Sequence, residues 1–122
     1  MSRKVAAKKT VGGRLKEQQL LATVPYEKGF HFFTGLGKYT GVTATGMVEF
    51  AQKLQIIPVQ SVTFHSQRQD FQKWLRNVVG DEELAKRIDK IRDSASYLSD
   101  ENLRKELFKT VHNRIAELQR HP

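Results

Sequence analysis

The sequence predicts a mainly α (α+β) fold, in which an N-terminal β-hairpin is followed by about five helices and preceded by a basic flexible N-terminal arm. Aromatic and β-branched residues around a glycine-rich turn predict the hairpin, and amphipathic stretches at helical spacing predict the helices. The 122 residues are enough for one domain. We expect a basic arm over residues 1–25 and a single hairpin-plus-helices domain over residues 26–122.

The arm carries most of the positive charge. The chain has 21 Lys and Arg against 13 Asp and Glu, a net charge of +8. Residues 1–28 contribute +5 of this, with seven basic and two acidic side chains. A polar segment of like charges buries too little apolar surface to fold alone. We therefore expect the arm to order on a negatively charged partner, the alternative being a solubilising tail.

The hairpin is expected at the start of the domain. Aromatic and β-branched residues flank a Gly-Leu-Gly turn, which predicts strands near residues 29–34 and 39–43. A lone hairpin is marginally stable in water, so it must lie on helices. The face buried there should carry Phe30 and Phe32, or alternatively Phe33.

Two helices follow the hairpin. Thr45 is the predicted N-cap of a helix over residues 46–55, because its hydroxyl can accept a free backbone N–H. Pro58 is the predicted first residue of a helix over residues 58–67, where a missing N–H has no cost. Both helices have an apolar face that should turn inward.

Three more helices complete the domain. The third should begin with Asp70 as its N-cap and end at Gly80, which is free to adopt a positive φ. Asp81 should open the fourth helix, and Ser99 should cap a last helix over residues 100–119. The expected core residues of the third helix include Phe71, Trp74, Leu75, Val78 and Val79. Those of the last helix are Leu103, Leu107, Val111, Ile115 and Leu118.

No catalytic motif is readable, so we expect a protein that is not an enzyme, with no catalytic residue, no cofactor and no metal site. There is no cysteine, and neither a nucleophile elbow nor a phosphate-loop pattern is found in the sequence. His65 and Asp70 could together orient a base or bind a metal, with His31 nearby. We favour a structural histidine, whose ring nitrogens are satisfied by Asp70 or by the backbone.

Five strings in residues 29–118 form a broad pattern: FHFFTG, TG-x-T-A-T-x-M-x-E-F-x-x-K-L, S-V-T-F-H, D-F-x-x-W-L and G-D-E-E-L-A-x-R-I. On these strings the chain resembles an uncharacterised, mainly archaeal domain family of unknown function. The matching positions are caps, core aromatics and a turn, so the resemblance implies no activity and no catalytic residue. The arm at residues 1–25 lies outside this stretch, which places the specific function in the arm as much as in the domain.

The sequence favours a non-enzymatic nucleic-acid-associated protein that binds RNA, and we expect it to be ribosome-associated through its basic arm. Basic arms that fold on RNA suit that setting, and their contacts are made mainly to phosphates. Basic residues of the later helices have acidic neighbours, which is typical of a solvated face with i,i+4 pairs. The predicted contact residues are Arg3, Lys4, Lys8, Lys9, Arg14 and Lys16.

The alternative is a protein-interaction or homo-oligomerisation module with a regulatory role and no nucleic-acid contact. It rests on the aromatic hairpin and on Phe108, which lies off the apolar stripe of the long last helix. A homodimer would be the simplest form of such a module. No apolar run approaches the ~18 residues of a membrane span. Since the basic N-terminus also lacks the apolar stretch of a secretory signal, we expect a cytoplasmic protein that does not contact membranes.

Overall fold

The structure is a computed structural model, which describes residues 18–94 and 97–120. Within that part it is mainly helical, with an antiparallel hairpin followed by five helices, and this confirms the predicted fold class. Residues 1–17, which form most of the predicted arm, lie outside the described residues. In chain order the elements are the 3₁₀ helix η1 (Tyr26–Lys28), the strands β1 (Phe30–Phe33) and β2 (Tyr39–Ala44), the helices α2 (Met47–Leu54), α3 (Val59–Arg68) and α4 (Asp70–Trp74), the π-helical turn η2 (Leu75–Val79), and the helices α5 (Glu82–Asp93) and α6 (Asp100–Gln119).

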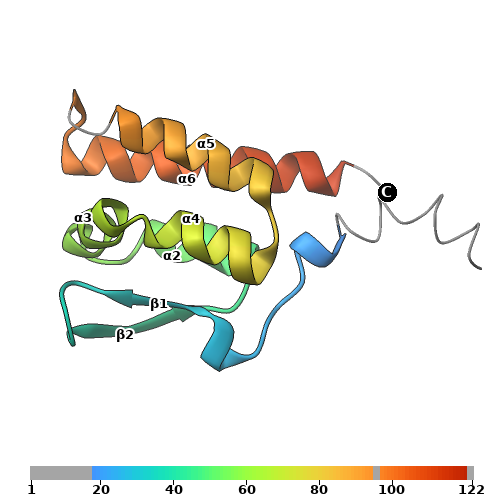
Figure 1. Cartoon of the computed structure of the whole chain (residues 1–122), viewed down its shortest axis with the longest axis horizontal. Helices are drawn as coiled ribbons and strands as arrows, with labels where there is room; N and C mark the ends of the chain where they lie inside the picture. The colour runs from blue at the N-terminus through green and yellow to red at the C-terminus, as the bar shows by residue number, and fades with distance from the viewer. Residues whose placement is uncertain (1–17, 95–96, 121–122) are drawn as a thin grey trace, which may run out of the picture.

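The elements form three layers, as Figure 1 shows. The hairpin is the outermost layer on one side, α2, α3 and α4 lie in the middle, and α5 and α6 pack against each other on the far side. The hairpin therefore has helices on one of its faces. None of the helices in the described residues is long and apolar enough to cross a membrane.

The inward face of the hairpin is the first of the two alternatives that the sequence left open. Alternation along β1 places Phe30 and Phe32 against the helices, where both are buried. His31 and Phe33 have the opposite phase and are only half-buried. The two strands pair antiparallel, with a shift in register between His31 and Phe33.

The core lies between the layers and is built from the expected apolar residues. Phe71 and Trp74 are buried in it, as predicted, and the indole Nε1 of Trp74 donates to the carbonyl of Lys28 at 2.9 Å. Val78 and Val79 pack against it while partly buried. The whole predicted stripe of α6 is buried, namely Leu103, Leu107, Val111, Ile115 and Leu118.

Residues upstream of Tyr26 also contact the domain. Leu20 is 8% exposed and belongs to the core, and the N–H of Val24 donates to the carbonyl of Thr45 at 2.7 Å. Residues 18–25, which the sequence places in the arm, are therefore packed on the helices or the hairpin at these two points. The arm over residues 1–17 stays a prediction.

Two predicted N-caps are wrong. The N-cap of α2 is Gly46, whereas Thr45 uses its N–H and its hydroxyl as donors to Glu49 Oε1, at 2.9 and 3.0 Å. The hydroxyl of Thr45 therefore donates to the acidic side chain of the first turn instead of accepting a helix N–H. Asp70 is the first residue of α4 rather than its cap, because Gln69 makes the break between α3 and α4 with a φ of 60°.

The other helix boundaries lie close to the predicted ones. Pro58 precedes α3 as its N-cap instead of being its first residue. Asp81 and Ser99 cap α5 and α6 as predicted, by accepting backbone N–H groups at 3.0 and 3.2 Å. Gly80 ends the third helical stretch with a φ of 89°, also as predicted. That stretch finishes in a wide π-helical turn because the N–H of Gly80 donates to the carbonyl of Leu75.

Candidate functional site

The six predicted RNA contacts lie outside the described residues. Residues 1–17 contain all of them and one acidic side chain, so this segment carries +5 of the net charge of +8. The rest of the chain contributes only +3. What the described domain can add to the binding of an anion therefore depends on which of its basic side chains are free. Arg3, Lys4, Lys8, Lys9, Arg14 and Lys16 make up the set outside the structure.

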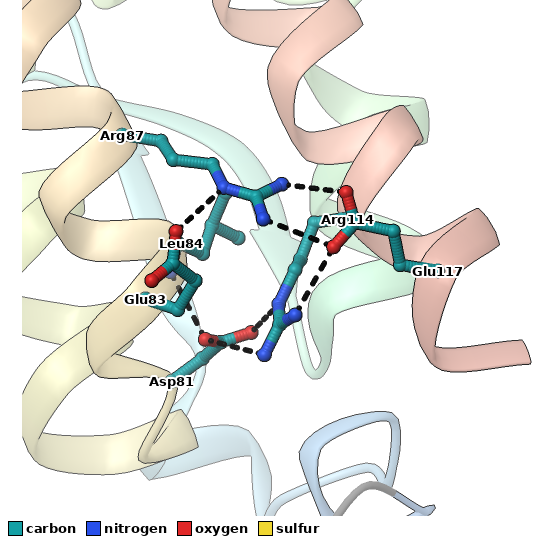
Figure 2. A network of polar contacts seen from close by, with 6 residues as sticks. All are labelled: Asp81, Glu83, Leu84, Arg87, Arg114 and Glu117. Carbon is teal, nitrogen blue, oxygen red and sulfur yellow. Dashed lines mark hydrogen bonds and ion pairs between the residues drawn. The ribbon is translucent and has the colours of Figure 1, made fainter. Parts of the chain in front are cut away.

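Two arginines join α5 to α6 through a network of carboxylates, which Figure 2 shows. Arg114 donates to both oxygens of Asp81 at 2.9 and 3.3 Å, and to Glu117 at 3.2 Å. Arg87 donates to Glu83 at 2.9 Å and to both oxygens of Glu117 at 2.8 and 3.0 Å. The hydrogen bonds from Arg87 are the main reason why the pKa of Glu117 is lowered to about 2. Both guanidinium groups are thus engaged within the domain.

Further arginines are held in the same way. Arg76 donates to Glu82 and Asp89 on α5, at 2.8 and 2.6 Å. Arg104 Nη1 donates to the carbonyl of Leu54, the last residue of α2, at 2.8 Å and to the carbonyl of Ile57 at 2.7 Å. These contacts differ from the predicted i,i+4 pairs along one helix, since they connect different elements and in the case of Arg104 end on backbone carbonyls. The guanidinium groups of Arg76 and Arg104 are thus bonded to groups within the domain.

The lysines differ from the arginines in this respect. Within the described residues the only lysine in an ion pair is Lys109, whose Nζ lies 3.8 Å from Glu106. A long ion pair between exposed side chains contributes little to stability, so this ammonium also stays largely free. The other exposed lysines of that part are Lys28, Lys38, Lys73, Lys86, Lys90 and Lys105.

The solvent-facing side of the hairpin carries a cluster of aromatic residues. We call it the outer hairpin face and define it by Tyr26, His31, Phe33, Tyr39 and Thr43. Ring centroids of His31 lie 5.0 Å from Tyr26 and 6.0 Å from Tyr39, and Phe33 lies 5.4 Å from Tyr39. The hydroxyls of Tyr26 and Tyr39 are hydrogen-bonded at 2.9 Å, and Thr43 Oγ1 bonds both Tyr39 and His31. Sequence reasoning missed this cluster, although its strand residues share the phase opposite to Phe30 and Phe32.

His65 joins β1 to α3 and α4. Its Nε2 accepts the N–H of Phe33 at 2.8 Å, so the ring proton sits on Nδ1, which donates to Asp70 Oδ2 at 2.8 Å. Burial lowers the pKa of His65, against the opposing effect of Asp70. The ring is therefore neutral, and both of its nitrogens are satisfied, one by the backbone and one by Asp70, as the structural interpretation predicts.

The described contacts of Asp70 are made with His65 and Arg68. Arg68 Nε donates to the same oxygen of Asp70 at 3.1 Å, while His31 bonds Thr43 and does not join the pair. In the part of the chain that the structure describes, no group of three His, Cys, Asp or Glu side chains is placed to hold a metal ion.

A cavity of about 390 Å³ lies between the hairpin and the end of α3. Apolar groups such as Phe33, Leu36 and Phe64 line most of it, and Arg68 and Asp70 add polar groups. The glycine-rich turn that borders it is a hairpin turn, since the N–H of residue 38 donates to the carbonyl of residue 35 at 3.0 Å. A cavity of this size could hold a small ligand or the side chains of a bound peptide.

The chain matches no curated protein and no solved structure at a significant level. The sequence model of one family matches residues 6–112. The match starts inside the basic segment and includes Lys8, Lys9, Arg14 and Lys16, so the expectation that residues 1–25 lie outside the family pattern is wrong from residue 6 onward. The packing of Leu20 in the core gives a physical reason for this. The chain thus belongs to a family of unknown function, DUF5752.

Proposed function

We propose that this protein is a non-enzymatic RNA-binding protein that contacts phosphates through its basic N-terminal residues. The observation that carries the proposal is the division of charge. The arginines that join the helices are engaged by carboxylates and carbonyls, whereas residues 1–17 hold six basic side chains and one acidic one. The exposed lysines of the domain would add weaker contacts. The proposed contact residues are Arg3, Lys4, Lys8, Lys9, Arg14 and Lys16.

Contacts of this kind have a measurable signature. Each phosphate that a basic side chain neutralises releases counterions, so affinity falls as salt rises. Replacing all six residues by Ala should weaken binding to a labelled single-stranded RNA and reduce the slope of log K against log salt by up to about 4, since each contact contributes roughly 0.7. Fluorescence anisotropy over a series of KCl concentrations measures both quantities.

A matched control separates local contacts from net charge. A second variant replaces six exposed basic residues of the helices by Ala, which removes the same formal charge. We expect it to lose less affinity and less slope than the N-terminal variant. Equal losses, or an N-terminal variant that binds like the unmodified protein, would contradict the proposal. The control positions are Lys73, Lys86, Lys90, Lys105, Lys109 and Arg120.

We further propose that the RNA is ribosomal. This finer proposal is supported by the general behaviour of basic segments that fold on RNA rather than by a feature of the domain. The full-length protein should co-sediment with ribosomal particles through a sucrose gradient at low salt and leave them at high salt. If the protein stays at the top of the gradient at low salt but still binds free RNA, the proposal of a ribosomal partner is wrong. The proposal of RNA binding would then still hold.

A protein-interaction or homo-oligomerisation module is the second candidate function. The cavity beside the hairpin favours it, because Leu36 at its border is 79% exposed. Phe108 supports it less, since it is partly buried against the core and stacks on His112 at 5.5 Å. Light scattering would show a dimer at both low and high salt, with no co-purifying nucleic acid, if this second function is the correct one.

A further inference from the structure

The geometry points to the outer hairpin face as a surface on which the bases of single-stranded RNA stack. This inference rests on the proposed function and gives it a second contact, made to bases rather than to phosphates. The surface is the one defined above by Tyr26, His31, Phe33, Tyr39 and Thr43. Stacking on aromatic side chains is sequence-tolerant because every base has a π-face.

The aromatic residues of this face are not needed to fill the core. The inward phase of β1 already supplies Phe30 and Phe32, which are 5% and 0% exposed. Tyr26 and Tyr39, by contrast, are 59% and 42% exposed. Figure 1 shows α2, α3 and α4 on one side of the hairpin. His31 and Phe33 are half-buried and line the cavity beside α3, so the two tyrosines are the more exposed part of the outer hairpin face. Exposed apolar patches of this kind usually mark a binding surface.

The rings are also held in place before any ligand binds. The hydroxyls of Tyr26 and Tyr39 bond each other, and Thr43 Oγ1 holds Tyr39 and His31. Tyr26 belongs to the helix η1. The indole of Trp74 donates to the carbonyl of Lys28, the last residue of η1, and so anchors this helix to the core. These hydrogen bonds are made at the edges of the rings, and a preorganised surface loses less entropy on binding.

Charge complementarity favours RNA as the occupant. Residues 81–120 hold nine basic and nine acidic side chains, so the α5 and α6 layer, which lies far from the hairpin in Figure 1, has no net charge. The entire excess of +8 lies in residues 1–80. Lys28 and Lys38 are exposed, and each lies within two residues of a tyrosine of the outer hairpin face. Glu27 is the only acidic residue between residues 18 and 48. A strand that stacks its bases here would have its phosphates near these two ammonium groups.

The test compares two exposed tyrosines of this face with a third elsewhere. Tyr26→Ala and Tyr39→Ala should each lower the affinity for a labelled single-stranded oligoadenylate roughly tenfold, with an unchanged salt slope. Tyr97→Ala is the matched control, because Tyr97 is 89% exposed in the segment between α5 and α6. Tyr39→Phe keeps the ring but removes the hydroxyl that bonds Tyr26 and Thr43, so its affinity should lie between those of Tyr39→Ala and the unmodified protein. Thermal unfolding of each variant confirms that the fold is intact.

The outcomes separate this inference from the proposed function. If Tyr26→Ala and Tyr39→Ala bind oligoadenylate as the unmodified protein does, while the six-residue N-terminal variant loses binding, the stacking surface is wrong and the proposed function stands. If the unmodified protein binds no RNA, both are wrong. A duplex RNA of equal length should bind all the tyrosine variants equally, since its bases are already stacked. An equal loss for duplex and single strand would overturn the inference.

Discussion

At the scale of single residues, His65 shows how one buried side chain connects three elements. It accepts from the backbone of β1, donates to the first residue of α4, and itself belongs to α3. Its ring also contacts Phe30 edge-on, with centroids 4.7 Å apart. Because it is 4% exposed, removal of its polar atoms would leave the N–H of Phe33 without its acceptor and Asp70 with Arg68 as its remaining donor.

We predict that His65→Ala lowers the free energy of unfolding by about 2–4 kcal/mol, from the lost hydrogen bonds and the cavity that is left. Urea denaturation at neutral pH measures this change. The control is His112→Ala, since His112 is exposed on α6, and we expect a change below about 0.5 kcal/mol. A loss at His65 no larger than at His112 would show that the buried contacts contribute nothing.

The lowered pKa of His65 predicts a pH dependence with a definite sign. As the pH falls, the ring in the unfolded chain takes up a proton around its ordinary pKa of 6.5. The folded state keeps the ring neutral to a lower pH, so protonation favours the unfolded chain. The stability that this ring contributes is therefore complete above about pH 6.5 and declines as the pH falls through the lower folded pKa. In His65→Gln this part of the decline should be absent, and identical pH profiles of the two proteins would contradict the assignment.

At the scale of elements, the contact between α5 and α6 depends on polar groups as well as on the apolar stripe. Asp81 illustrates this, since its side chain is 1% exposed, caps α5 and accepts two bonds from Arg114 on α6. Glu117 bridges Arg114 and Arg87 and so completes the network in Figure 2. A carboxylate that accepts several charge-assisted hydrogen bonds stabilises the folded state.

Glu117→Gln should lower the free energy of unfolding by about 1–2 kcal/mol near neutral pH, since this carboxylate is partly exposed and its pairs are partly screened. Its pKa is about 2 in the folded state against 4.5 ordinarily. The contribution is therefore complete above about pH 4.5 and disappears as the pH falls toward 2, so the variant and the unmodified protein should converge there. Glu106→Gln is the control, because its partner Lys109 is 3.8 Å away, and a difference that persists at pH 2 would contradict the mechanism.

At the scale of the whole molecule, charge and packing are divided between different parts of the chain. The core of the described residues begins at Leu20, and residues 1–17 carry +5. Removal of residues 1–17 should therefore change the free energy of unfolding by less than about 1 kcal/mol, and it should reduce RNA affinity as the six-residue Ala variant does. Urea denaturation and anisotropy measure the two effects. A large loss of stability would show that this segment belongs to the folded domain.

Local spacing explains why so much of the fold could be predicted. Gly80, Asp81 and Ser99 end or begin helices as predicted, because a cap depends on a residue and its neighbours three or four positions away. The predictions for Thr45 and Asp70 are wrong although the residues that bond them are also close in the chain. Each has a suitable side chain, but Glu49 in one case and His65 in the other offered a competing partner.

The candidate surfaces could be predicted only in part. The sequence located the positive charge, since its position along the chain requires no structure. It did not reveal the outer hairpin face, because Tyr26 comes from a separate 3₁₀ helix and only the folded chain brings it to His31 and Tyr39. Nor did it reveal which arginines are engaged, because the partners of Arg114 and Arg87 include residues 33 and 30 positions away.

By itself, then, the sequence determined the order of the elements, the caps at Gly80, Asp81 and Ser99, and the concentration of charge at the N-terminal end. These properties depend on periodicity, caps and composition, which act over a few residues. Only the tertiary structure showed that His65 is held neutral by bonds to β1 and α4. It also showed that Arg114 and Arg87 are bonded within the domain, and that Tyr26 and Tyr39 are exposed on one face of the hairpin. These depend on the stacking of three layers, which brings together side chains that no local pattern connects.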